Sequence, residues 1–169
     1  ERTWSLLSQS KALLIQDYAK GLLSEEILQN LICKSKNQKI PVVIDPHRNT
    51  NPDFYRGAFL ITPNVAEAEV LLGRKLDKGQ NSRVIEKALV ELKEKFALET
   101  VLITRSQYGM SLLDENEAIV HLPSIPKAVY DVTGAGDTVV AALGSALSLG
   151  ADLLTAAVIS TAAAGVVAV

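Results

Sequence analysis

The sequence predicts a three-layer α/β fold, in which a mostly parallel sheet lies between two layers of helices. Short apolar runs alternate along the chain with stretches of helical periodicity, and this alternation is typical of parallel sheets. The apolar runs are short and continuous, as expected of strands that are buried on both faces. The predicted strands cover residues 11–17, 41–45, 58–62 and 100–104.

Three helices are predicted between these strands. Ser24 is a favourable N-cap residue followed by two acidic residues, which predicts a helix over 24–38. A second helix begins after Asn64 and ends at Gly73, and a third, more polar helix covers 82–96.

After the fourth strand, the sequence predicts a β-hairpin and then two helices. The hairpin pairs 109–115 with 117–123 and has Glu115 and Asn116 at its turn. The two helices separate near Gly150 and Asp152. The second contains the apolar run 153–169, which is shorter than a usual membrane span and is expected to be a core helix.

The composition excludes several classes of protein. The 169 residues suit one domain, and a hydrophobic content of 48% with 21% charged residues is enough for a core. A net charge of −2 gives no basic field for nucleic acid or for an anionic membrane. The single cysteine, Cys33, excludes a disulfide framework and a cysteine-rich zinc site, so a cytoplasmic protein is expected.

Polar residues follow each of the four predicted strands. They lie at 17–21, 45–47, 62–64 and 104–106. Because ligands of open α/β sheets bind beyond the carboxyl ends of the strands, these four clusters predict a site on one rim of the sheet.

The segment Gly134-Ala135-Gly136-Asp137 immediately precedes a helical run of small apolar residues. Glycines here allow the backbone to approach a ligand, and the N–H groups of the first helical turn favour an anion. An ionised Asp137 beside such an anion site could accept a proton from a bound hydroxyl, as phosphoryl transfer to an alcohol requires. The alternative is a glycine turn in which Asp137 is only a helix cap.

Three motifs in order carry a resemblance to a known family. They are Asp-Val-Thr-Gly-Ala-Gly-Asp at 131–137, Thr-Pro-Asn-Val-Ala-Glu at 62–67 and the loop at 104–109. Together they resemble the ribokinase-like (PfkB) carbohydrate kinases. Within that family, residues 17–21, 54–69 and 101–113 are most similar to the D-glycero-β-D-manno-heptose 7-phosphate kinases.

The resemblance implies a site that binds ATP and Mg²⁺ and carries a catalytic base. It makes Asp137 the base that takes the proton from the sugar hydroxyl. The resemblance implies that the N–H groups of Gly134, Ala135 and Gly136 stabilise the transferring phosphoryl group. It implies that ATP and Mg²⁺ are bound by Asn64, Val65, Ala66 and Glu67, with Glu67 acting on the metal directly or through water, and that the nucleotide is also bound by Thr104, Ser106 and Gly109. Finally, it implies that the sugar phosphate is bound by Asp17 and Lys20 and that a monovalent cation such as K⁺ is bound by Asp131 and Thr133.

Some of these residues have simpler structural interpretations. Asn64 and Glu67 share one face of a first helical turn, so Glu67 could equally complete a capping box with Thr62 or Asn64. Asp17 and Lys20 could belong to a solvated turn. Arg105 could contact a phosphate or lie on the surface.

The sequence also departs from the family pattern at three positions. His47 follows the Asp-Pro pair where close relatives tend to have lysine, and a neutral histidine would remove a permanent cation. Ser106 replaces the first glycine of the commoner nucleotide loop, and Thr161 replaces a frequent asparagine near the adenine.

The resemblance implies a phosphotransferase that phosphorylates heptose 7-phosphate at O1 in ADP-heptose synthesis for the lipopolysaccharide core. Residues 1–169 would form the C-terminal, ATP-binding and catalytic portion of one ribokinase-like domain, without the N-terminal sugar-binding and lid portion. We therefore expect these residues alone to be inactive, because both substrates must be held together. A homodimer is expected for the full-length protein.

Three other functions remain open at this point. The acceptor could be ribose, fructose, fructose 1-phosphate or a nucleoside, since a fold does not fix a substrate. The chain could be a non-catalytic nucleotide-binding relic, although such a relic would not need all of Asn64, Glu67 and Asp137. An adenylyltransferase is disfavoured because neither His47 nor His121 lies in a nucleotide motif.

Overall fold

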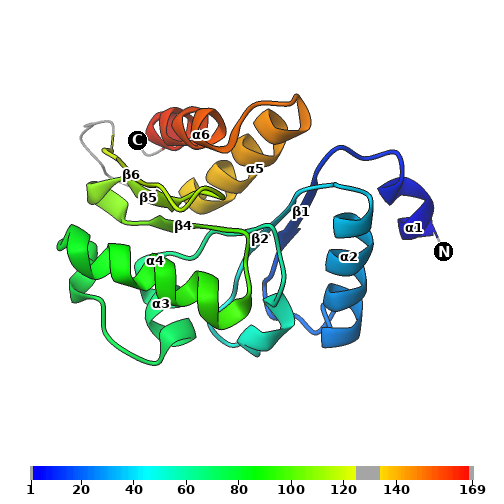
Figure 1. Cartoon of the computed structure of the whole chain (residues 1–169), viewed down its shortest axis with the longest axis horizontal. Coiled ribbons are helices and arrows are strands. Elements are labelled where there is room, and N and C mark those ends of the chain that lie inside the picture. Colours follow the sequence, from blue (N-terminus) through cyan, green and yellow to red (C-terminus); the bar gives the residue numbers. More distant parts are fainter. Residues whose placement is uncertain (1, 125–133, 168–169) are drawn as a thin grey trace.

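The computed structural model describes residues 2–124 and 134–167 of the chain. A six-stranded sheet lies between two layers of helices (Figure 1). Helices α2, α3 and α4 cover one face of the sheet, and α5 and α6 cover the other. The predicted three-layer fold is therefore confirmed.

The strands lie in the sheet in the order in which they occur in the chain. The first four are parallel and the last two form an antiparallel hairpin, so the sheet is mostly parallel, as predicted. The strands are β1 (Leu13–Gln16), β2 (Val42–Asp45), β3 (Leu60–Ile61), β4 (Thr100–Thr104), β5 (Met110–Leu113) and β6 (Ile119–Leu122).

Capping residues set the ends of the helices where the sequence predicted them. The Ser24 hydroxyl accepts a hydrogen bond from the N–H of Ile27, and Gly73 ends α3 in the left-handed conformation. The helix α1 was not predicted. The helices are α1 (Arg2–Leu7), α2 (Glu25–Asn37), α3 (Val65–Leu72), α4 (Ser82–Phe96), α5 (Ala135–Ser148) and α6 (Leu153–Val167), with 3₁₀ turns η1 (Pro52–Tyr55), η2 (Asp77–Gly79) and η3 (Ser106–Tyr108).

The two-residue alternation of the strands separates two hydrophobic cores. Ile44 and Ile103 belong to the core under α2, α3 and α4. Their neighbours Val43 and Leu102 belong to the core under α5 and α6. Continued to the carboxyl ends of the four parallel strands, this alternation places four polar residues on the α5 side of the sheet: Gln16, Asp45, Thr62 and Thr104.

The apolar segment at the end of the chain is a core helix, as predicted. Leu153, Ala156 and Ala157 of α6 are buried against the sheet and α5. Among the described residues, no helix combines the length and apolar character needed to cross a membrane.

Candidate active site

The first turn of α5 brings Asp137 to the carboxyl ends of the parallel strands. The Asp137 carboxylate accepts a hydrogen bond of 2.6 Å from Nε2 of Gln16, the last residue of β1. Tyr18, two residues further along, also contacts Asp137, whose charge raises the pKa of the Tyr18 phenol. The predicted rim site thus includes Asp137. It also includes Tyr18, which sequence analysis placed in a strand-end cluster without a role, and Gln16, which sequence analysis did not identify.

The backbone before Asp137 suits an anion. Gly134 is the N-cap of α5 at φ 82°, a conformation that L-residues with a side chain avoid, and no side chain caps the helix. A Cβ at Gly136 would meet no atom within 4 Å, so this glycine leaves open space at the first turn. Since the first-turn N–H groups of a helix have no intrahelical partner, they are available to a ligand in this space.

Asp45 places a second carboxylate on the same rim. It is paired in register with Gln16 and accepts a hydrogen bond from the Thr62 hydroxyl at 3.3 Å. Burial, together with the charges of Glu67 and Asp137, raises the pKa of Asp45 to about 7. Sequence analysis placed Asp45 in a strand-end cluster but gave it no role. The carboxylates of Glu67 and Asp137, whose charges act on Asp45, are distant from it in the sequence and cannot be recognised from the residues beside it.

The raised pKa of Asp45 predicts that its substitution by asparagine stabilises the protein at neutral and alkaline pH. A carboxyl group that is harder to ionise in the folded state than in the unfolded state makes its full contribution to the free energy of unfolding only below about pH 4, near its unfolded pKa. This contribution is lost as the pH rises to about 7, the pKa of Asp45 in the folded state. The expected gain for Asp45→Asn is on the order of 3 kcal/mol at pH 8 and close to zero at pH 4.

Thermal unfolding in metal-free buffer between pH 4 and pH 8 would measure this gain. The matched control is Asp53→Asn, which removes an exposed carboxylate that pairs with Arg56. We expect the control to change stability by less than about 1 kcal/mol at either pH. If the gain in stability from Asp45→Asn did not grow with pH, the raised pKa of Asp45 would not be its cause.

Asn64 and Glu67 form the capping box that sequence analysis gave as one alternative. The Asn64 side chain accepts from the N–H of Glu67 at 3.0 Å, and Glu67 Oε2 accepts from the N–H of Asn64 at 2.9 Å. Burial raises the pKa of Glu67 despite these hydrogen bonds. Because the cap uses only Oε2, it leaves Oε1 for a further ligand.

The two motifs at 62–67 and 104–109 meet at the rim. Asn64 and Thr104 form an isolated parallel bridge, and the N–H of Thr104 donates to the carbonyl of Pro63 at 3.0 Å. Val65 and Ala66 continue from this bridge as the first residues of α3. The structure thus brings the residues predicted to bind nucleotide and Mg²⁺ to one end of the sheet.

The loop at 104–109 is tightly constrained. Ser106 has φ 52°, in the left-handed region that glycine occupies without strain, which explains why glycine is common there. A Cβ at Gly109 would collide with the carbonyl of Leu122 and the backbone of Pro123 and Ser124, so only glycine fits between this loop and the end of β6.

Arg105 of this loop is neither a surface residue nor an open phosphate ligand. Its side chain is buried, and the guanidinium donates to the carbonyls of Gly79 and Gln80 at 2.9 and 3.4 Å. It also donates to the Ser111 hydroxyl at 3.0 Å and lies 3.4 Å from Nδ1 of His121. Arg105 therefore anchors the loop between η2 and the hairpin.

Asp17, the predicted sugar ligand, is held in place by hydrogen bonds within the protein. It is 7% exposed, and its two carboxylate oxygens accept hydrogen bonds from the Tyr55 hydroxyl and the N–H of Ala19, both at 2.7 Å. Burial raises the pKa of Asp17, but hydrogen bonds from Thr50, Tyr55 and Ala19 outweigh it, and the net pKa is lowered. Lys20 is exposed beside this turn.

The structure gives no site geometry for the other predicted positions. Asp131 and Thr133, the predicted ligands of a monovalent cation, lie outside the described residues. Thr161 donates to the carbonyl of Ala157 and contacts the sulfur of Met110 on β5. Within the described part of the chain, no group of three or more His, Cys, Asp and Glu side chains is arranged to hold a metal ion by itself.

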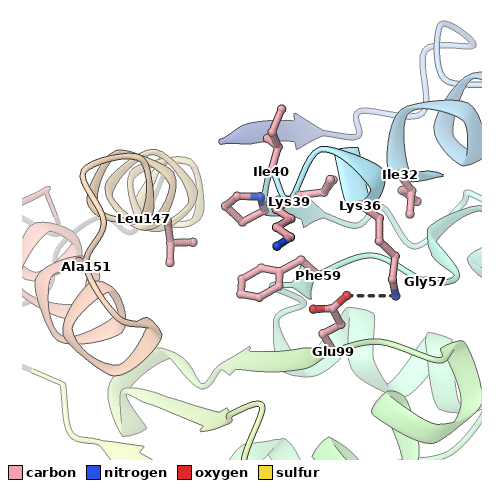
Figure 2. Close-up of a pocket in the computed structure, with 11 residues that line it drawn as sticks. Ile32, Lys36, Lys39, Ile40, Gly57, Phe59, Glu99, Leu147 and Ala151 are labelled. Carbon is pink, nitrogen blue, oxygen red and sulfur yellow. Dashed lines mark ion pairs between the residues drawn. The ribbon is translucent and has the colours of Figure 1, made fainter. Parts of the chain in front are cut away.

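A separate cavity lies at the opposite end of the sheet. It has a volume of about 490 Å³, and Figure 2 shows it between the end of α5, marked by Leu147, and α2, with Phe59 and Lys39 facing the space. Lys36 and Glu99 form an ion pair of 3.1 Å at its edge. None of the predicted site residues lines this cavity, so it is distinct from the candidate active site.

Comparisons with known proteins found relatives that match nearly all of this chain. The chain is 45% identical over 167 residues to "Bifunctional protein HldE" of Proteus mirabilis, which covers 99% of this chain and 34% of that protein. The HldE protein of Vibrio vulnificus is 44% identical over 95% of this chain and 32% of its own length. The chain thus spans about a third of the length of the curated relatives that it matches.

Solved structures share the fold. Arabidopsis thaliana ribokinase complexed with ribose and ATP superposes with a TM-score of 0.79 at 22% identity, covering 99% of this chain and 53% of that one. Ribokinase from Thermotoga maritima gives a TM-score of 0.75 at 27% identity, covering 98% and 52%. The model of the pfkB family carbohydrate kinases matches residues 1–168. This chain belongs to the pfkB family of carbohydrate kinases.

Proposed function

We propose that this chain is the ATP-binding and catalytic portion of a kinase that phosphorylates D-glycero-β-D-manno-heptose 7-phosphate at O1, in ADP-heptose synthesis for the lipopolysaccharide core. The observation that carries the proposal is the position of Asp137 at the N-terminus of α5, beside the ends of β1 and β2. The choice of heptose 7-phosphate rests on the similarity to the HldE proteins.

In this proposal Asp137 takes the proton from the attacking sugar hydroxyl. Its oxygen Oδ1 is held by Gln16, and Oδ2 is left to accept that proton. The N–H groups at Gly134, Ala135 and Gly136 stabilise the negative charge of the transferring phosphoryl group, because they point outward from the positive end of α5. The products are the phosphorylated sugar and ADP, and the proton resides on Asp137.

The carboxylates of the rim fit a bound divalent cation. Burial is the main reason that Asp45 has a pKa of about 7, and the charges of Glu67 and Asp137 raise it further. A cation among these carboxylates would relieve their repulsion. Asn64 and Glu67 would hold Mg²⁺, in part through water, beside the nucleotide loop of Thr104, Ser106 and Gly109. Bound ATP with Mg²⁺ supplies the phosphoryl group and neutralises its charge.

The proposal extends to the organisation of the protein. Residues 1–169 form the C-terminal part of one kinase domain, and the sugar is held mainly by a preceding N-terminal portion that also mediates dimerisation. Asp17 and Lys20 contribute at the edge of the sugar site, and Asp131 with Thr133 provides a K⁺ site. The protein acts in the cytoplasm, where its substrates ATP and sugar phosphate are found.

An acceptor panel tests the proposal. ADP formation from ATP and Mg²⁺ would be measured with the full-length protein against heptose 7-phosphate, ribose, fructose, fructose 1-phosphate and a nucleoside. Turnover on heptose 7-phosphate alone is the expected result. Preferred turnover of another acceptor would overturn the substrate, and ATP binding without turnover of any acceptor would overturn the kinase activity.

A further inference from the structure

Gln16 and Asp137 are 121 residues apart in the chain but share the shortest side-chain contact of the rim. The Gln16 amide nitrogen lies 2.6 Å from Asp137 Oδ1. Asp137 is exposed and Gln16 is half-buried, so this hydrogen bond does not satisfy a fully buried polar group. Its place beside the proposed base suggests a role in the reaction rather than in stability.

The packing of β1 against α5 fixes this contact. Gly144 of α5 packs directly on the Leu14 side chain, and a Cβ at Gly144 would collide with it. Leu14 and Gln16 lie on one face of β1, and Asp137 and Gly144 are seven residues apart on one face of α5. The close approach at Leu14 and Gly144 therefore sets the distance at Gln16 and Asp137.

Gln16 provides a neutral donor at this position. Its amide can hold one carboxylate oxygen by a hydrogen bond without placing a positive charge beside it. A lysine here would stabilise the ionised carboxylate and oppose proton transfer to it, whereas an apolar residue would leave the side chain of Asp137 free to rotate. Tyr18 is 57% exposed, whereas Gln16 is half-buried, so Tyr18 is the weaker of the two partners.

We propose that Gln16 is a positioning residue that fixes Oδ1 of Asp137 and thereby directs Oδ2 toward the acceptor hydroxyl. This inference rests on the proposed function, because it assigns Gln16 to the same proton transfer. Gln16 contacts Asp137 and need not contact either substrate. Its loss should therefore lower kcat and leave the KM for ATP nearly unchanged.

The test compares two isosteric variants in the full-length kinase. Gln16→Met removes the donor and should lower kcat about 10-fold to 100-fold, with the KM for ATP within about twofold of wild type. Gln16→Glu places a second carboxylate against Asp137 and should lower kcat further. In an Asp137→Asn background, Gln16→Met should have no additional effect, because the group that it positions is gone.

Gln29→Met is the matched control. The Gln29 amide donates to the carbonyls of Phe54 and Arg56, both at 3.0 Å, on the face of the sheet opposite to α5. Gln29→Met should lower the melting temperature and leave kcat unchanged. Gln16→Met should lower kcat and leave the melting temperature unchanged.

The outcomes separate this inference from the proposed function. If the wild-type protein phosphorylates no acceptor, the proposed function fails and the role of Gln16 fails with it. If the wild type is active and Gln16→Met has the same kcat, only the role of Gln16 is overturned. A loss of kcat that adds fully to that of Asp137→Asn would also overturn it, because the two residues would then act independently.

Discussion

Substitution of Asp137 by asparagine is expected to lower the kcat of the full-length kinase by about 10²-fold to 10⁴-fold, the usual contribution of a general base. Asparagine has nearly the same shape, but its amide cannot take the proton from the acceptor hydroxyl. The helix N-terminus and the capping box of Asn64 and Glu67 remain in place, so ATP should still bind. Steady-state turnover together with calorimetric titration of ATP would measure both effects.

Asp152→Asn is the control for this prediction. Asp152 also lies at the start of a helix on the α5 side of the sheet, where its carboxylate accepts from the N–H and hydroxyl of Thr155. It lies beyond the opposite end of α5 from Asp137, so its loss should leave kcat unchanged. If Asp137→Asn retained more than about a tenth of wild-type turnover, Asp137 would not be the general base.

Elements whose ends are set by local chemistry could be predicted from the sequence. Ser24 caps α2, Gly73 ends α3, and α4 has the bounds that its periodicity predicts. The hairpin was also found, because its apolar runs and polar turn are adjacent. Helix α1 was missed, since its six residues include neither an acidic first turn nor a basic last turn.

The candidate site could be predicted only where its residues form local motifs. Asp137 and Asn64 were found because each stands in a short pattern with its own chemistry. The contacts of Gln16 with Asp137 and of Tyr55 with Asp17 join residues 121 and 38 positions apart. Such partners are set by the packing of whole elements, and no local pattern identifies them.

The surroundings of Arg105, a buried charged residue, could not be predicted from the sequence either. The sequence shows an arginine after a strand and leaves open whether it meets solvent, a phosphate or the protein. In the structure it is 5% exposed and surrounded by four acceptors from three segments. Its partners identify it as the residue that holds the loop at 104–109 in place.

The hydrogen-bond roles of the two ring nitrogens of His121 follow from this network. Because a guanidinium can only donate, Nδ1 of His121 must accept, and Nε2–H then donates to Glu86 at 3.0 Å. The Ser111 hydroxyl accepts from Arg105 and donates to Nδ1 at 2.8 Å. Ser111, His121 and Glu86 are thus linked like a hydrolytic triad, but Ser111 is fully buried and cannot reach a substrate.

Substitution of Arg105 by methionine is therefore expected to have the largest effect on stability. It leaves the carbonyls of Gly79 and Gln80 and the Ser111 hydroxyl without their donor, whereas His121 keeps its hydrogen bond with Ser111. Each buried acceptor that loses its partner costs about 1–3 kcal/mol, so the expected loss is about 3–5 kcal/mol. Since 1 kcal/mol corresponds to about 2–4 °C for a domain of this size, the melting temperature should fall by about 10 °C.

Two further variants accompany this experiment: Arg105→Lys separates the effect of charge from that of hydrogen bonding, and Arg74→Met is the control at a surface arginine. Lysine keeps the charge but has a single nitrogen that cannot reach all four acceptors, so it should recover only part of the loss. Arg74 pairs with Glu91 at 2.8 Å on the surface, and its substitution should cost less than about 1 kcal/mol. Because Arg105 lies between Thr104 and Ser106, Arg105→Lys should also raise the KM for ATP while leaving kcat at saturating ATP close to wild type. A melting temperature of Arg105→Met within 2–3 °C of wild type would mean that the network does not hold the loop.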